Sequence, residues 1–189
     1  MQDTDSSKPK TPASHARFAT THWTVVLAAG SPDSSRYREA LEMLCQIYWY
    51  PLYAYLRRRG YNTHQAEDYT QGFLTRLLER QSLKRADPTQ GRFRSFLLSS
   101  LKHFIADEWD HAQAKKRGGD KRVFSLDVAD AETRYSWEPA HTLSPEQLFE
   151  KSWALTILQQ AIVQLKTECA EAGKLILFEH LKSYLQADD

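Results

Sequence analysis

The stretch that decides the fold is Arg92-Phe93-Arg94-Ser95-Phe96-Leu97-Leu98-Ser99-Ser100-Leu101-Lys102-His103-Phe104-Ile105-Ala106-Asp107-Glu108-Trp109, which runs on to a glycine pair at 118–119. Its apolar residues recur three and four positions apart, which predicts a helix with one buried face that ends at the glycines. Arg94, Lys102 and His103 are expected on or near the opposite face, and Lys115, Lys116 and Arg117 at the basic end. Such a surface suits an unpaired nucleic-acid strand. A core helix with a solvated basic face is the simpler alternative.

The composition is that of a globular protein. The chain has 189 residues, of which 41% are hydrophobic and 26% charged. No apolar run approaches the ~20 residues that span a bilayer, and the first residues are too polar for a signal peptide, so we expect a cytoplasmic protein without membrane contact. Cys45 and Cys169 lie in apolar helical patterns without a CxxC partner. They are expected to be buried free thiols.

The net charge of +1 conceals an asymmetry along the chain. Residues 1–124 hold 20 lysines and arginines against 13 acidic residues, a balance of +7, whereas residues 125–189 hold 5 against 11, a balance of −6. The basic part favours an anionic partner. The acidic part could fold back and screen that surface.

Periodicity predicts an all-α chain. A polar tail over 1–16 is expected to be disordered. Long helices are expected over about 34–59, from Asn62 onward, over 144–173 and over 174–186, with a loop over 81–91 and an irregular linker over 120–143. Pro51 should kink or divide the first of these helices. One core is expected to join the apolar stripes, built from Leu44, Tyr48, Leu52, Tyr69, Phe73, Leu77, Phe96, Leu97, Phe104 and Ile105.

Two motifs together are specific. Ala66-Glu67-Asp68-Tyr69-Thr70-Gln71-Gly72-Phe73-Leu74-Thr75-Arg76-Leu77 is followed, after the loop, by Phe93-Arg94-Ser95-Phe96-Leu97. This pair resembles region two of bacterial sigma factors of the sigma-70 family, closest to the extracytoplasmic-function (ECF) type. The resemblance covers roughly 17–119, and 144–189 resembles the lead-in to region four.

The resemblance implies a factor that binds core RNA polymerase, recognises and melts the promoter minus-ten element, and directs transcription initiation without a cofactor of its own. It implies that Glu67, Asp68, Gln71 and Arg76 dock on the clamp helices of the polymerase largest subunit. An anti-sigma factor is a further possible partner. The loop residues that capture an unstacked promoter base would be Lys84, Arg85, Asp87, Gln90 and Arg92. Phosphates and the duplex fork would meet Arg94, Lys102, His103, Trp109, Lys115, Lys116 and Arg117.

Two departures from the family pattern keep an alternative open. Gly72 stands where the family usually has glutamate, and no Gly-bearing turn with a basic recognition helix follows residue 144. The chain could therefore be a degenerate sigma-like helical module that binds polymerase or a regulator without opening promoters. A general single-strand nucleic-acid binder is the third reading.

Enzymatic chemistry has little support in the sequence. His103 and Asp107 share a helix face, but no third metal ligand stands at a useful spacing. The chain has no phosphate-binding glycine loop and no nucleophile elbow. We therefore expect neither a metal site nor a catalytic one.

Overall fold

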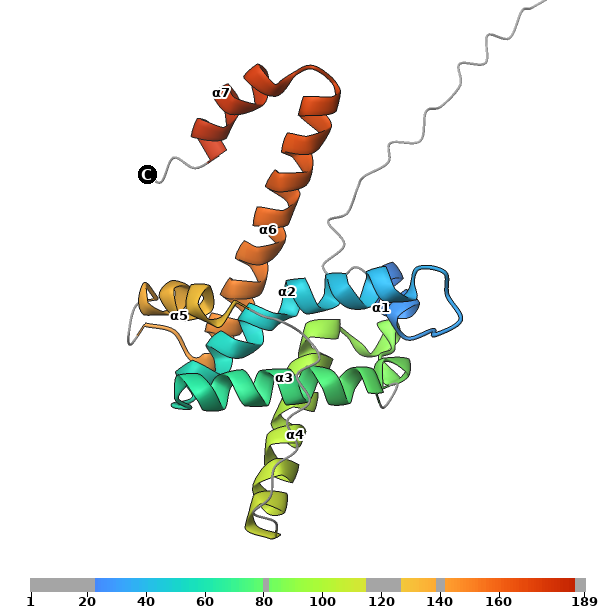
Figure 1. Cartoon of the computed structure of the whole chain (residues 1–189), viewed down its shortest axis with the longest axis vertical. Helices are drawn as coiled ribbons and strands as arrows, with labels where there is room; N and C mark the ends of the chain where they lie inside the picture. Colours follow the sequence, from blue (N-terminus) through green and yellow to red (C-terminus); the bar gives the residue numbers. More distant parts are fainter. Residues whose placement is uncertain (1–22, 80–81, 115–126, 139–141, 186–189) are drawn as a thin grey trace, which may run out of the picture.

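The computed structural model describes residues 23–79, 82–114, 127–138 and 142–185, which form helices without a strand among them (Figure 1). The expected all-α class is confirmed. The elements are α1 (Trp23–Ala29), α2 (Tyr37–Arg58), α3 (Thr63–Glu79), the short 3-10 helices η1 (Ser82–Arg85) and η2 (Pro88–Gln90), α4 (Phe93–Ala114), α5 (Val128–Ser136), α6 (Pro145–Glu171) and α7 (Leu175–Leu185).

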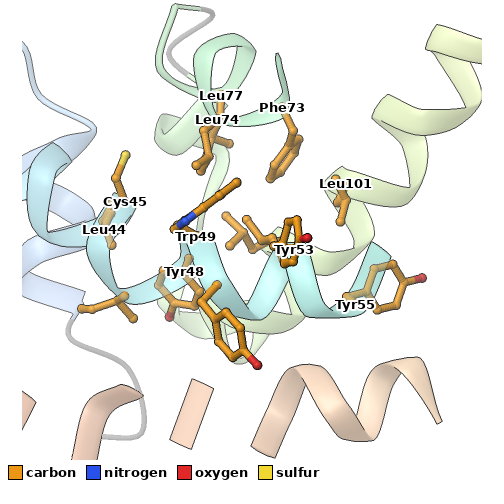
Figure 2. Packing of buried hydrophobic residues seen from close by; sticks show 14 of the residues in the cluster. Leu44, Cys45, Tyr48, Trp49, Tyr53, Tyr55, Phe73, Leu74, Leu77 and Leu101 are labelled. Carbon is orange, nitrogen blue, oxygen red and sulfur yellow. The ribbon is translucent and has the colours of Figure 1, made fainter. Parts of the chain in front are cut away.

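Helix α2 lies at the centre of the molecule. Every residue from 47 to 56 is buried, because α1, α3, α5 and α6 all pack around this segment. The expected apolar stripe is therefore part of a helix that is buried on all sides, as an aromatic-rich sequence without charges from Ile47 to Leu56 allows. Figure 2 shows Phe73, Leu74 and Leu77 of α3 directed at Trp49 and Tyr53 of α2.

Of the two outcomes expected at Pro51, a kink or a division, the structure excludes the division, since α2 continues through it from Tyr37 to Arg58. The proline removes one backbone hydrogen-bond donor, which costs ~3 kcal/mol in an isolated helix. Burial of the surrounding side chains offsets that cost, because Leu52, Tyr53 and Leu56 have no exposed surface.

The expected core is confirmed. All ten residues named from the sequence belong to one cluster, in which Tyr69, Phe96 and Ile105 are partly buried and the others buried. Phe73 and Phe104 join α3 to α4 with ring centroids 5.8 Å apart. Aromatic pairs at this separation add to the burial of their apolar area.

Part of the segment that the sequence predicted to be an irregular linker is helical. Residues 128–136 of the expected linker form α5, whose Ala131 is buried. The first half of α6 packs on α2 and buries Leu148 and Phe149 completely. Helices α5 and α6 thus contribute Ala131, Leu148 and Phe149 to the same core as α2.

The second half of α6 extends away from this core, and α7 returns from a turn at Gly173, whose φ of 67° suits glycine (Figure 1). Among the described residues, no helix combines the length and the apolar character needed to cross a bilayer.

Candidate polymerase and nucleic-acid interface

Helix α3 begins at a capping box, as the sequence predicted. The side chain of Asn62 accepts from the Gln65 amide at 2.9 Å, and Gln65 Oε1 accepts from the Asn62 amide at 3.1 Å. The box sets which face of α3 is buried, and Ala66, Thr70, Phe73, Leu74 and Leu77 turn inward.

Three of the four expected polymerase contacts lie together on the outer side of α3. Asp68 is exposed, while Glu67 and Gln71 are half-buried. Gln71 Nε2 donates to Glu67 Oε1 at 3.4 Å, which holds the two side chains parallel along the helix. Three adjacent polar groups with one exposed carboxylate can orient a basic or polar partner helix.

Arg76, the fourth expected contact, lies apart from them. Its guanidinium donates to Asp107 Oδ2 at 2.6 Å and lies 5.5 Å from the centroid of the Phe104 ring. A second carboxylate, that of Glu108, is 4.0 Å away. Arg76 therefore ties α3 to α4.

An open groove of about 550 Å3 runs between α3, η1 and α4. Arg85 from the loop and His103 from α4 both line it, although 18 positions separate them in the sequence. Phe96 and Phe104 supply aromatic surface, and Arg76 and Asp107 close one side. The structure thus brings together a loop cation, a helix imidazole and aromatic rings in one hollow.

The imidazole of His103 has a defined orientation. Its Nδ1 lies 2.8 Å from the carbonyl oxygen of Ser99, and because that oxygen can only accept, Nδ1 carries the proton. In the neutral ring, Nε2 is then the acceptor. The side chain can offer that atom to a base edge or, when protonated, an N–H to a phosphate.

The loop before α4 is anchored by Leu83 and Ala86, which are buried, so that Lys84, Arg85, Gln90 and Arg92 remain exposed. Asp87, however, is engaged within the loop. Its Oδ1 accepts from the side chain of Thr89 at 2.7 Å and from the Thr89 amide at 2.8 Å. The hydrogen bond from the Thr89 hydroxyl and, to a smaller extent, the one from the Thr89 backbone amide lower the pKa of Asp87. This carboxylate shapes η2.

Arg94 is not on an exposed face, which corrects the expectation from the helix pattern. It is 5% exposed, its Nε donates to Glu150 at 2.5 Å, and its guanidinium lies 4.3 Å from the ring centroid of Trp153. The reason is that α6 covers this flank of α4, and the periodicity of α4 alone could not show that.

Lys102 lies on the same flank but nearer to solvent. Its Nζ donates to Glu146 Oε1 at 2.9 Å, and this contact raises the pKa of Lys102 and lowers that of Glu146. Trp109 is exposed, at 56%. The remaining expected DNA contacts, Lys115, Lys116 and Arg117, lie outside the described residues.

Phe96, Ser100 and Asp107 line the groove but were absent from the site expected from sequence. The spacing of these residues could have identified them. Phe96, Ser100, His103 and Asp107 follow one another at intervals of four, three and four positions, which places all four on one side of α4.

Cys45 is buried, and burial, with a smaller contribution from Glu42, raises the pKa of its thiol to about 11. It therefore stays protonated near neutral pH. Within the described parts of the chain, no three His, Cys, Asp or Glu side chains gather as metal ligands would.

No protein-family model, curated protein or solved structure matches this chain.

Proposed function

We propose that this chain is an ECF-type sigma factor, which binds core RNA polymerase through α3 and holds the opened minus-ten element of a promoter in the groove between η1 and α4. The observation that carries the proposal is the convergence of Arg85 and His103 on one groove with Phe96. The resemblance of the α3 and α4 motifs to sigma region two points to the same surface.

The groove offers what an unstacked base requires. Moving a base out of a duplex costs a few kcal/mol, which stacking and hydrogen bonds must offset. The half-buried ring of Phe96 supplies aromatic surface, and Arg85 supplies a cation to the adjacent phosphate. Gln90, exposed on the preceding loop, offers an amide to a base edge. Lys84 and Arg92 are further exposed cations in the segment that precedes α4.

Docking on polymerase is assigned to Glu67, Asp68 and Gln71. They lie outside the α3–α4 contact, so a partner helix can reach them while the groove stays open. The same face is where an anti-sigma factor would compete. Arg76 is removed from the docking set, because Asp107 and Phe104 hold it at the groove.

Gly72 supports a second candidate, a sigma-like module that binds polymerase or a regulator without opening promoters. A Cβ atom at this position would lie 3.2 Å from Cζ of Phe104. The glutamate usual in the family would therefore require Phe104 to move, so one polymerase contact of the family pattern is absent.

In vitro transcription with purified core polymerase, on fragments of the source genome and on a premelted template, separates the candidates. A sigma factor yields transcripts from defined start sites, whereas the module binds polymerase and yields none. A general single-strand binder binds DNA equally well without polymerase, and that result would contradict both the sigma factor and the sigma-like module.

Two pairs of variants assign the surfaces. Asp68→Arg with Gln71→Ala should weaken binding to core polymerase, while Glu42→Arg, a reversal of an exposed carboxylate on α2, should not. Arg85→Ala with His103→Ala should weaken binding of the holoenzyme to the premelted template, while Arg38→Ala, the loss of an exposed cation on α2, should not. Equal effects of test and control variants would contradict the assignment.

A further inference from the structure

Ion pairs connect the basic and the acidic parts of this chain. Among the described residues, three such pairs join a cation of α2 or α4 to a carboxylate of α5 or α6. They are Arg57 with Glu132, Arg94 with Glu150, and Lys102 with Glu146. The acidic part thus supplies counter-charges at positions where the basic part can also attract an external anion.

The Glu132 carboxylate of α5 is held in the way that a bound oxyanion would be. Arg57 Nη2 donates to one of its oxygens at 2.7 Å, and Arg57 Nε donates to the other at 3.0 Å. The Tyr53 hydroxyl donates to that second oxygen as well. A guanidinium that contacts two oxygens of one group in this way also matches the geometry of a phosphate. We call the Tyr53 hydroxyl and the Arg57 guanidinium the cradle.

Both donors of the cradle are positioned by residues outside α5. Arg57 Nη1 donates to the backbone carbonyl of Tyr61, in the turn after α2, at 2.7 Å. The Tyr53 ring packs against Trp49 of α2, with ring centroids 5.6 Å apart. The cradle is therefore expected to keep its shape when Glu132 leaves. Donors that are already in position lose little conformational entropy when they bind another anion.

An aromatic ring lies next to the cradle. Tyr50, Tyr53 and Arg57 follow one another at intervals of three and four positions, which places them on one side of α2. The guanidinium of Arg134 on α5 lies 3.7 Å from the centroid of the Tyr50 ring. Helix α5 thus places an anion in the cradle and a flat group on the neighbouring ring. A nucleic-acid strand supplies the same two elements with a phosphate and a base.

Helix α5 is attached to α2 with little apolar burial. Among its nine residues, all of them described, Ala131 is buried, whereas Val128 and Tyr135 are half-buried. The other attachments are hydrogen bonds and cation–π contacts, made by Glu132, Arg134 and Tyr135. A ligand can replace such contacts with equivalent ones of its own. Displacement of α6, by contrast, would expose two completely buried side chains of the core.

We propose that the side of α2 beneath α5 is a binding site for single-stranded nucleic acid, in which the cradle holds a phosphate and Tyr50 stacks on the adjoining base. In the free chain α5 occupies this site, with Glu132 in the place of the phosphate and Arg134 in the place of the base. Figure 1 shows α5 at the end of α2 where α3 begins, away from the loop over residues 82–90 that borders the groove. The site is therefore distinct from the groove and does not rest on the proposed function.

The test is the affinity of the full chain, without polymerase, for a fluorescein-labelled oligothymidylate of about 12 nucleotides, measured by fluorescence anisotropy. Glu132→Gln should bind about fivefold more tightly than the wild type, because it removes the charge that competes for the cradle. Glu39→Gln is the matched control, since it removes the same charge beside Arg36 on an exposed part of α2, and it should bind as the wild type does. The gain should persist when Arg85→Ala and His103→Ala are added, because those two residues belong to the groove.

Two further measurements locate the site. Arg57→Ala should abolish the gain in affinity of Glu132→Gln, with circular dichroism showing that the helix content is retained. Hydrogen exchange of the wild-type chain needs no substitution and is therefore independent of how the variants fold. At saturating oligonucleotide, the amides of α5 should exchange faster than in the free chain, because the strand takes the place of α5.

Several outcomes would overturn the proposal. An unchanged affinity of Glu132→Gln would do so, as would an equal gain in Glu39→Gln or a gain that disappears together with the groove residues. Exchange of the α5 amides that is unchanged or slower on binding would show that α5 stays in place. If a polyglutamate peptide binds the Glu132→Gln chain as tightly as the oligonucleotide does, the site takes an acidic protein segment, and the assignment to nucleic acid is wrong.

Discussion

A Cβ atom on Gly72 of α3 would lie 3.2 Å from Cζ of Phe104 on α4. Glycine inside a helix costs ~1 kcal/mol relative to alanine, and Gly72 has an ordinary helical setting with no turn to form. The close approach of the Phe104 ring is therefore the physical reason for a glycine at this position.

Gly72→Ala should change the free energy of unfolding by less than ~0.5 kcal/mol, because the gain in helix propensity is offset by crowding against Phe104. In a Phe104→Leu background the crowding is relieved, and the same substitution should stabilise by about 1 kcal/mol. Urea denaturation of the four proteins measures the coupling. Equal effects in both backgrounds would show that Phe104 does not select glycine.

Arg94→Ala should destabilise the protein by about 2 kcal/mol, because it breaks the contact of the buried Arg94 guanidinium with the half-exposed Glu150 and removes the guanidinium from Trp153. Lys102→Ala should cost less than ~1 kcal/mol, since both members of its pair with Glu146 are half-exposed. Chemical denaturation compares the two.

Replacement of Arg94 by methionine, which keeps much of the length of the side chain, should leave the salt dependence of DNA binding unchanged. A reduced slope of log affinity against log salt concentration would show that Arg94 does contact DNA.

Asp87→Asn should behave like the wild type in base preference, because an amide oxygen can still accept from the Thr89 amide and hydroxyl. Asp87→Ala should release η2 and change the preference. Selection of bound sequences from a randomised premelted template, with holoenzyme, reports both. If the asparagine variant alters base preference as strongly as the alanine variant, the carboxylate contacts DNA directly.

Glu132 on α5 should contribute to stability in a pH-dependent way. Arg57 donates to the carboxylate of Glu132 at 2.7 and 3.0 Å. These hydrogen bonds and, to a smaller extent, one from the Tyr53 hydroxyl hold the pKa of Glu132 below its usual range. A lowered folded-state pKa gives stability that is present above the unfolded value of about 4.5 and lost as pH falls through the folded value. Glu132→Gln should therefore be less stable than the wild type at pH 7, and the difference should shrink toward pH 3. A difference that is independent of pH would mean that the charge of Glu132 is not involved.

The sequence by itself determined the long helices, two of their N-terminal caps and the core. Periodicity placed the inward residues of α3 and α4, and the capping boxes at Asn62 and Ser144 were visible as short-range patterns, because both depend on residues three or four positions apart. The loop cations and His103 were likewise chosen from local pattern and resemblance.

Only the tertiary structure decided which flanks of these helices remain open. Arg94 and His103 are both polar residues beside the apolar stripe of α4, yet Glu150 and Trp153 bury the first while the second lines a groove with Arg85. The order of α5 and the continuity of α2 through Pro51 were decided in the same way. Each depends on packing between segments dozens of residues apart. The residue spacing within one segment does not predict how much free energy is gained when Phe149 or Leu52 is buried against distant helices.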